Sequence, residues 1–280
     1  MVNTYSTNLP IPQPVPKLSN NVFDLFSLKG KVAVVTGASS GIGYAVSEAF
    51  AQAGASLALW YNSNTELVEK AKIMAEKYNV KVITYKCPVT EEPKVKETVE
   101  QVVKDFGKID IFIANAGVAW TKGSLINATE QGVDESEWKK VMHTDFDGVY
   151  YCAKHVGPQF KKQGNGSMVI TASMSGHIVN VPQFQACYNA AKAGVLHYAK
   201  SLAIEWTPFA RVNTVSPGYV ETPITVFANQ ELKDHWRRLT PMGREGVPQE
   251  LVGAYLYFAS DASTFTTGSD LIVDGGYCAV

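Results

Sequence analysis

Short runs of apolar residues alternate along the chain with longer stretches in which apolar residues recur at helical spacing. Residues 32–35 form a run of aliphatic side chains, which is typical of a buried strand, and residues 42–53 follow with helical spacing. The same succession repeats to the end of the chain. It predicts strands at residues 32–35, 56–61, 81–86, 109–114, 167–172, 211–215 and 271–273, and helices at residues 42–53, 65–78, 91–106, 134–163, 188–203 and 248–260.

This alternation predicts an α/β fold in which right-handed crossovers place the strands side by side in one parallel sheet. A single Rossmann-type doubly wound sheet, with helices on both faces, accounts for residues 29–280 without an internal linker. Residues 1–28 differ in composition and are interpreted as a Pro-rich N-terminal arm. Its prolines at positions 10, 12, 14 and 16 stand among Asn, Ser and Thr, which favours an extended segment.

The composition is that of a globular protein without a nucleic-acid or membrane partner. Hydrophobic residues make up 46% and charged residues 18% of the 280 positions, so the chain can bury a sizeable core. The 25 basic and 26 acidic residues give a formal net charge of −1 with no charged block. No apolar run has the length of a membrane span and no secretory signal pattern opens the chain, so we expect a cytoplasmic location. The cysteines lack metal-ligand spacing, so we expect reduced thiols and no metal: Cys87, Cys152, Cys187 and Cys278.

The turn after the first predicted strand is rich in glycine and opens a helix. In a doubly wound sheet, ligands bind outside the carboxyl ends of the strands, where this turn lies. Its glycines allow a tight turn, close approach of a phosphate to the backbone and close packing of helix on strand, while the helix N-terminus faces the phosphate charge. The position after the first strand therefore predicts dinucleotide binding by Gly37, Ser39, Ser40, Gly41, Ile42 and Gly43.

The end of the second predicted strand bears on which dinucleotide is bound. An acid at this place normally accepts hydrogen bonds from the ribose hydroxyls of NAD(H). The chain has Asn62, Ser63 and Asn64 here instead. Neutral donors suit the 2′-phosphate of NADP(H), which an aspartate would repel, so NADP(H) is favoured. No Lys or Arg stands in the glycine-rich turn or directly after this strand to pair with that phosphate.

Tyr188 and Lys192 lie one turn apart in a predicted helix, so the phenol and the ammonium share a face. Bringing the pKa of a tyrosine from about 10 to about 7 takes roughly 4 kcal/mol of preference for phenolate. An ammonium about 4 Å away supplies roughly 1 kcal/mol in bulk water but about 4 at the effective dielectric of a protein site. The pair can therefore act as a general acid and base in a site that is partly closed to water.

The ends of later strands carry further polar and glycine residues. These segments are Asn115-Ala116-Gly117, Ser173-Met174-Ser175-Gly176, Ser216-Pro217-Gly218-Tyr219-Val220-Glu221-Thr222 and Asp274-Gly275-Gly276. In this order, and together with the glycine-rich turn and the Tyr188/Lys192 pair, they resemble the short-chain dehydrogenase/reductase family over residues 29–280. Within it, the Pro-rich arm and the segments at 25–31 and 201–206 are similar to yeast and fungal carbonyl reductases of the group related to sorbose reductases and NADP-dependent mannitol dehydrogenases.

The resemblance implies NADPH-dependent reduction of a ketose or a small or aryl ketone to a secondary alcohol, and the reverse oxidation. Tyr188 would donate a proton to the carbonyl oxygen, Ser173 would hold that oxygen, and Lys192 would lower the tyrosine pKa and bind the nicotinamide ribose. It also implies a homotetramer, with which the apolar content of the 134–163 and 188–207 helices agrees. Further cofactor contacts are implied at Asn115, Ala116, Gly117, Tyr188, Lys192, Pro217, Gly218, Val220 and Thr222.

Two positions depart from the family pattern. Asp145 stands where the family has an asparagine that holds a proton-relay water, so we assign it to the catalytic group and expect its charge also to pair with Lys192. Pro88 replaces the usual acid near the adenine, which rules out a side-chain contact there. Side chains in loops after strands can line the substrate pocket, although aromatic residues at such places more often serve in packing. The candidates are Trp120, His177, Phe184, Tyr219 and Phe227.

Two other functions are compatible with parts of the sequence. A non-catalytic NADP-binding protein with a regulatory role would need no proton donor, and the intact set of Ser173, Tyr188 and Lys192 argues against it. An NAD-linked polyol dehydrogenase on the same fold is disfavoured because no acid follows the second strand.

Overall fold

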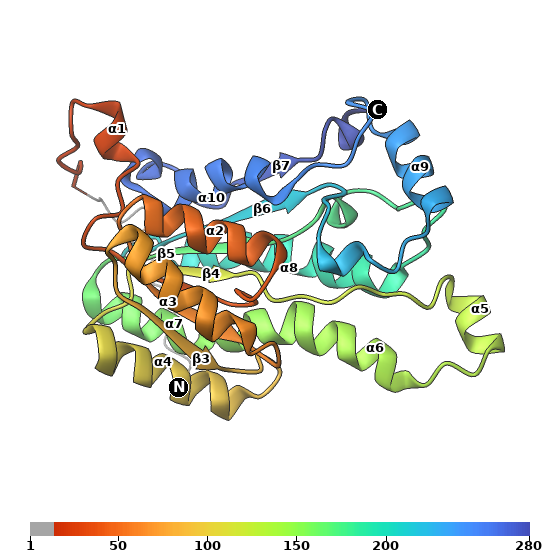
Figure 1. Ribbon diagram of the computed structural model, residues 1–280, viewed down its shortest axis with the longest axis horizontal. Helices are drawn as coiled ribbons and strands as arrows, with labels where there is room; N and C mark the ends of the chain where they lie inside the picture. The colour runs from red at the N-terminus through yellow and green to blue at the C-terminus, as the bar shows by residue number, and fades with distance from the viewer. Residues whose placement is uncertain (1–13) are drawn as a thin grey trace, which may run out of the picture.

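The computed structural model describes residues 14–280 as one seven-stranded parallel sheet between two layers of helices (Figure 1). The strand order is β3-β2-β1-β4-β5-β6-β7. The predicted fold class is confirmed. Of the Pro-rich arm, positions 10 and 12 lie outside the described residues, and residues 14–19 carry no helix or strand. The strands are β1 (Val32–Val35), β2 (Ser56–Tyr61), β3 (Val82–Lys86), β4 (Ile111–Ala114), β5 (Ser167–Thr171), β6 (Arg211–Pro217) and β7 (Asp270–Val273).

The register of the sheet brings the carboxyl ends of its strands to one edge. Val35 at the end of β1 lies beside Leu59 and Ile113, and Ala114 lies beside Ile170. Because all strands are parallel, the loops that follow them also gather at this edge. The glycine-rich turn and the loops after β4, β5 and β6 are thereby brought together.

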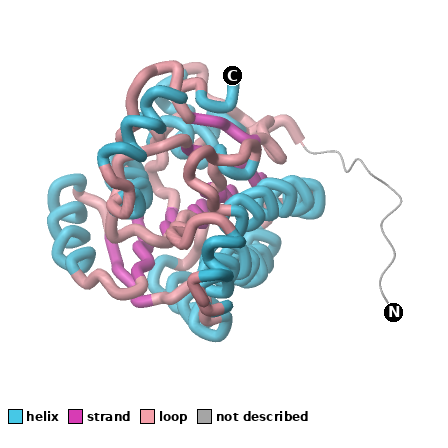
Figure 2. The backbone as a smooth tube through the Cα atoms, turned by 90° about the vertical axis from the view of Figure 1, so that its right-hand side faces the viewer, coloured by secondary structure: helices cyan, strands magenta, loops and turns pink. Residues whose placement is uncertain are grey.

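Alternate residues of each strand face the two helical layers. Val34 of β1 packs in one core cluster with residues of α4, α7 and α8, while its neighbours Ala33 and Val35 pack in the other with α2, α3 and α10. In the view of Figure 2 helices lie on both sides of the strands. The helices are α1 (Val22–Leu25), α2 (Gly41–Gln52), α3 (Glu66–Tyr78), α4 (Glu92–Phe106), α5 (Leu125–Glu130), α6 (Glu135–Met142), α7 (Gly148–Gln163), α8 (Ala186–Trp206), α9 (Gln230–Leu239) and α10 (Val252–Ala259).

The single helix predicted over residues 134–163 is interrupted. A π-helical turn, His143–Asp147, separates α6 from α7. The apolar residues on either side of the turn, among them Val141, Val149 and Cys152, keep helical spacing in the sequence, so the pattern does not show the turn. Such turns occur often at functional sites, and this one carries the buried Asp145.

Other elements also differ from the expectation in detail. The helix predicted at 248–260 begins with a 3₁₀ turn, Pro248–Glu250, before α10. The short helices α1, α5 and α9 were not predicted, because α1 and α5 are only four and six residues long and α9 is strongly polar. No helix of the described part of the chain is long and apolar enough to cross a membrane.

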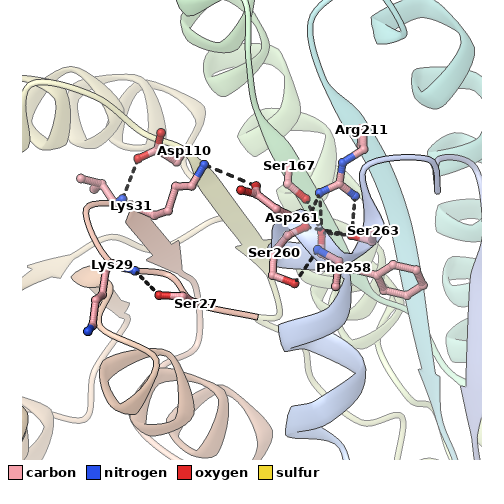
Figure 3. Close-up of polar contacts among 12 residues, drawn as sticks. Ser27, Lys29, Lys31, Asp110, Ser167, Arg211, Phe258, Ser260, Asp261 and Ser263 are labelled. Carbon is pink, nitrogen blue, oxygen red and sulfur yellow. Dashed lines mark hydrogen bonds and ion pairs between the residues drawn. The ribbon is translucent and has the colours of Figure 1, made fainter. Parts of the chain in front are cut away.

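At the amino ends of the strands, polar contacts join segments that are far apart in sequence (Figure 3). Arg211 donates from Nη2 to the Phe258 carbonyl oxygen at 2.9 Å and from Nη1 to Ser263 Oγ at 2.8 Å. Burial lowers the pKa of this guanidinium to about 10. Asp110 accepts from the Val32 backbone N–H at 2.7 Å. These contacts fix the amino ends of β1, β4 and β6, and leave the carboxyl edge for function.

Candidate active site

A cavity of about 470 Å³ opens at the carboxyl edge of the sheet. Loops that follow six of the strands, β1 to β6, contribute to its wall. All four residues assigned to catalysis line it, together with every predicted cofactor contact except Gly43. Its predicted residues are Gly37, Ser39, Ser40, Gly41, Ile42, Asn62, Ser63, Asn64, Asn115, Ala116, Gly117, Asp145, Ser173, Tyr188, Lys192, Pro217, Gly218, Val220 and Thr222.

Tyr188 and Lys192 project from the first turns of α8 on one face, as their spacing predicts. The Lys192 Nζ lies 5.4 Å from the centre of the Tyr188 ring. The lysine side chain is 4% exposed and donates to the Thr171 carbonyl oxygen at 3.1 Å. This bond to the end of β5 holds the ammonium next to the phenol.

Asp145 is buried against the same lysine. Its Oδ1 lies 2.9 Å from Lys192 Nζ, an ion pair without the angular geometry of a hydrogen bond, and its Oδ2 accepts from the Val118 backbone N–H at 2.9 Å. A Cβ at Gly117 would come within 2.7 Å of Oδ1, so only glycine leaves room for the carboxylate here. The π-helical turn and the loop after β4 therefore place a negative charge directly beside the ammonium.

The charges around Tyr188 oppose one another. Burial raises the pKa of Tyr188 above its ordinary value, the Lys192 ammonium and the Ser173 hydroxyl lower it, and the Asp145 carboxylate raises it. Lys192 thus acts in the predicted direction, but in the protein alone burial outweighs it and the tyrosine is a phenol.

Burial would lower the pKa of Lys192, yet its partners Asp145 and Tyr188 raise it, so the lysine is charged. Burial raises the pKa of Asp145 while that ammonium and the Val118 N–H favour its carboxylate. The short contact and the backbone donor support an ion pair.

Ser173 reaches the pair because a glycine lets its loop approach α8. Its Oγ accepts from the Ser175 backbone N–H at 3.1 Å, at the start of a 3₁₀ turn, Met174–Gly176. A Cβ at Gly176 would stand 2.9 Å from the Lys192 backbone. The glycine of the Ser-x-x-Gly pattern is therefore required for this loop to pack closely against α8, the helix that carries Tyr188.

The cofactor end of the cavity is built on the glycine-rich turn. Gly37 has a φ of +64°, and a Cβ there would come within 2.9 Å of the Ala116 Cα. The hydroxyl of Thr36 accepts from the backbone N–H groups of Asn115 and Ala116 at 2.9 and 3.0 Å. The ends of β1 and β4 are thereby joined and form the floor of the site.

The start of α2 fits a phosphate group. Its first N–H groups have no intrahelical acceptor, and the side chain of the N-cap residue, Ser40, makes no capping hydrogen bond to them. A negative charge at this helix end is stabilised by the helix dipole. Gly43 was predicted to bind the cofactor, but it does not line the cavity. A Cβ there would overlap the Gly37 carbonyl oxygen, so this glycine is required for packing of the turn.

The end of the cavity after β2 and β3 has no charged side chain from these strands. Asn62 and Ser63 are exposed, whereas Asn64 accepts from the Glu66 backbone N–H at 3.0 Å and caps α3. Pro88 also lines this end. A neutral wall of this kind fits a 2′-phosphate better than it fits two ribose hydroxyls that lack an acceptor.

The other end of the cavity is part aromatic and part polar. Tyr219 and Phe227 line it as predicted, and Trp236 of α9 stacks on Tyr219 with ring centres 4.1 Å apart. Three predicted pocket residues lie elsewhere. Trp120 packs in a small core cluster, Phe184 is 52% exposed, and His177 Nε2 lies 3.0 Å from Asp270 Oδ2, so these three candidates do not line the cavity.

A chain of side-chain amides that the sequence did not reveal forms the polar part. Gln183 donates to the Gln185 oxygen at 2.6 Å, Gln185 donates to Ser175 Oγ and to Asn180, both at 3.0 Å, and Asn180 donates to the Tyr219 hydroxyl at 3.1 Å. Amides in a loop have no periodic signal. Only the two glutamines between Ser173 and Tyr188 mark the place.

A family model described as Enoyl-(Acyl carrier protein) reductase matches residues 37–278. With the Rossmann-type sheet and the site described above, this shows that the chain belongs to the short-chain dehydrogenase/reductase family. The predicted family is confirmed.

Individual relatives are similar over nearly the whole chain. A probable NADP-dependent mannitol dehydrogenase of Yarrowia lipolytica is 59% identical over 98% of both chains. The sorbose reductase of Candida albicans is 60% identical over 96% of this chain and 94% of its own. Among solved structures, the NADPH-dependent 3-quinuclidinone reductase of Rhodotorula rubra is 44% identical, with a TM-score of 0.92 over 97% of this chain and all of that one.

Proposed function

We propose that the protein is an NADP-dependent oxidoreductase that reduces a ketone to a secondary alcohol and oxidises the alcohol in reverse. The observation that carries this function is the convergence of Ser173, Tyr188 and Lys192 on one cavity that also holds the glycine-rich turn. The relatives support this proposal, since they include an NADP-dependent mannitol dehydrogenase, a sorbose reductase and an NADPH-dependent 3-quinuclidinone reductase.

When bound, NADPH would supply the hydride for the carbonyl carbon. The residues of the chain handle the oxygen. Ser173 holds the carbonyl oxygen with its hydroxyl, and Tyr188, which is a phenol in the free site, donates its proton to that oxygen as negative charge develops on it. One hydride and one proton thus convert the ketone to the alcohol. Lys192 stabilises the phenolate that remains, and its bond to the Thr171 carbonyl oxygen keeps it in place.

NADP(H) is the cofactor, because the cavity has phosphate-binding backbone at the start of α2 and neutral side chains after β2. An NAD-linked polyol dehydrogenase is the second candidate. Steady-state rates with NADPH and with NADH distinguish the two candidates. A higher kcat/KM with NADH would show that the cofactor is NAD(H) and not NADP(H).

For the substrate we propose a polyhydroxy ketone, a ketose, and its sugar alcohol. The amide chain that contacts Ser175 gives one wall of the cavity polar groups that suit hydroxyls, while the stacked Tyr219 and Trp236 suit the C–H face of a sugar. The experiment is to measure NADPH oxidation with a panel of ketoses, aryl ketones and cyclic ketones. Rates for all ketoses far below those for aryl or cyclic ketones would overturn the proposed substrate class and leave the reaction type intact.

We also propose a homotetramer. Apolar side chains on the outer faces of α7 and α8 support it, with Tyr150 42% and Ile204 66% exposed in the single chain. Exposed apolar groups on covering helices are typical of subunit contacts, and closed symmetric assemblies are the usual result. Light scattering at micromolar concentration tests this, and a mass of 30.5 kDa would contradict it.

The cytoplasmic location remains part of the proposal. The four cysteines are free thiols in the structure, which suits a reducing compartment. Fractionation of cells followed by immunodetection tests it, and recovery with a membrane or secreted fraction would refute it.

A further inference from the structure

The cofactor that the proposed function requires carries several phosphate charges, yet the two places where a cation would be sought hold none. Neither the glycine-rich turn nor the residues after β2 include Lys or Arg. Within residues 14–280, the charged side chains that line the cavity are Lys140, Asp145 and Lys192. Asp145 and Lys192 neutralise each other across 2.9 Å. The charge that remains to attract an anion is therefore that of Lys140.

Lys140 lies in the last turn of α6, on the face that looks into the cavity. Thr144, one turn further on, also lines the cavity, and its hydroxyl donates to the Lys140 carbonyl oxygen at 2.8 Å. Lys140 is an exposed residue. Its helix offers it no carboxylate, because the acids Glu135 and Glu137 pair with Lys139 and Lys122.

We propose that Lys140 binds a phosphate group of the dinucleotide and supplies the charge that the glycine-rich turn lacks. This inference rests on the proposed function for its ligand. A long, unpaired lysine at the mouth of a cavity can reach over a bound phosphate while its stem stays on the helix surface. Because Lys140 is an exposed residue, the interaction is a moderate one that added salt weakens.

The chain offers a matched control in the neighbouring residue. Lys139 is on the same helix turn, is paired with Glu135 at 2.9 Å, and does not line the cavity. Lys140→Met and Lys139→Met remove the same charge from adjacent positions, so they change the net charge of the protein equally. Lys140→Arg keeps the charge at the proposed position.

The experiment measures dissociation constants by calorimetry for NADPH, adenosine 2′,5′-bisphosphate and ADP. Lys140→Met should weaken NADPH binding about three- to tenfold at low salt, the range of an exposed ion pair or a charge-assisted contact. Lys139→Met and Lys140→Arg should stay within about twofold of the unmodified protein, and added salt should shrink the Lys140→Met effect.

The two adenosine phosphates show which group Lys140 contacts. Weaker binding of adenosine 2′,5′-bisphosphate alone assigns the 2′-phosphate, and equal weakening with ADP assigns the phosphates at the 5′ position. An equal loss of affinity in Lys139→Met and Lys140→Met would mean that Lys140 acts only through the net charge of the protein. Unchanged affinity in Lys140→Met would mean that Lys140 does not contact the phosphate. Either result overturns the inference. If the unmodified protein does not bind NADPH, it is the proposed function that fails.

Discussion

The Asp145 carboxylate lies 2.9 Å from the Lys192 ammonium in a part of the site where both side chains are almost fully buried. This pair couples the π-helical turn between α6 and α7 to the helix that carries Tyr188. Its charge acts on the proton donor as well, since it raises the pKa of Tyr188 while Lys192 lowers it. The protein thus holds its tyrosine protonated more firmly than a neutral residue at position 145 would.

Replacing Asp145 by asparagine should move the pH dependence of reduction to lower pH. Reduction requires the phenol, so its rate falls as pH rises through the pKa of Tyr188. Removing the negative charge takes away a cause that raises this pKa, so the fall should begin at lower pH than in the unmodified protein. The measurement is kcat/KM for the ketone against pH at saturating NADPH.

Asp147→Asn is the control for that profile. Asp147 lies two residues away in the same turn, but its side chain is 35% exposed and pairs with His143. Its variant should keep the unmodified profile. A profile of Asp145→Asn that coincides with the unmodified one would show that the carboxylate does not act on Tyr188.

Tyr188→Phe should lower kcat by roughly two to four orders of magnitude, the range that positioned acid catalysis contributes. The ring stays and only the hydroxyl is lost, so NADPH should bind within a few-fold of the unmodified affinity. Tyr198→Phe removes a hydroxyl from the same helix outside the cavity and should leave kcat nearly unchanged. Near-normal turnover of Tyr188→Phe would refute its assignment as proton donor.

The fold and much of the site follow from local signals in the sequence. Each of three signals predicts local structure from a few neighbouring residues. They are the aliphatic run of β1, the glycines after it, and the spacing of Tyr188 and Lys192. The parallel sheet then brings them together, because the loops after parallel strands share one edge. Ser173 could also be assigned from the sequence, because Gly176 three residues later lacks a side chain and thereby indicates a close contact.

The remaining parts of the site depend on contacts that no local pattern contains. The π-helical turn at Asp145 preserves the apolar spacing of the surrounding helix, so periodicity predicted one long helix. Trp236 lies on a short, polar helix whose one buried large residue is visible only after folding. His177 stands two residues beyond the loop's serines, but Asp270 of the edge strand draws it away from the cavity.

Ser63→Asp should reduce the preference for NADPH over NADH. A carboxylate after β2 would repel a 2′-phosphate and accept hydrogen bonds from ribose hydroxyls. Like charges in contact cost several kcal/mol when they are poorly solvated, and Ser63 is exposed, so we expect a fall of about tenfold or more in the ratio of kcat/KM values. Ser63→Asn, of similar size but neutral, should keep the ratio. An unchanged ratio in Ser63→Asp would place the 2′-phosphate elsewhere.

Gly176→Ala should disturb the site and the stability of the protein together. The new Cβ would stand 2.6 Å from Leu196 Cδ1 and 2.9 Å from the Lys192 backbone, and the backbone contact cannot be relieved by a side-chain rotation. Overpacking of this kind costs about 1–3 kcal/mol in free energy of unfolding. The loop that moves away carries Ser173, so kcat should fall as well.

Gly253→Ala is the control. An added Cβ at this position in α10 meets nothing within 4 Å, so the variant should be slightly more stable and its kcat unchanged. Urea unfolding and steady-state kinetics on both variants check this, and equal stability of the two would show that α8 does not need glycine at position 176.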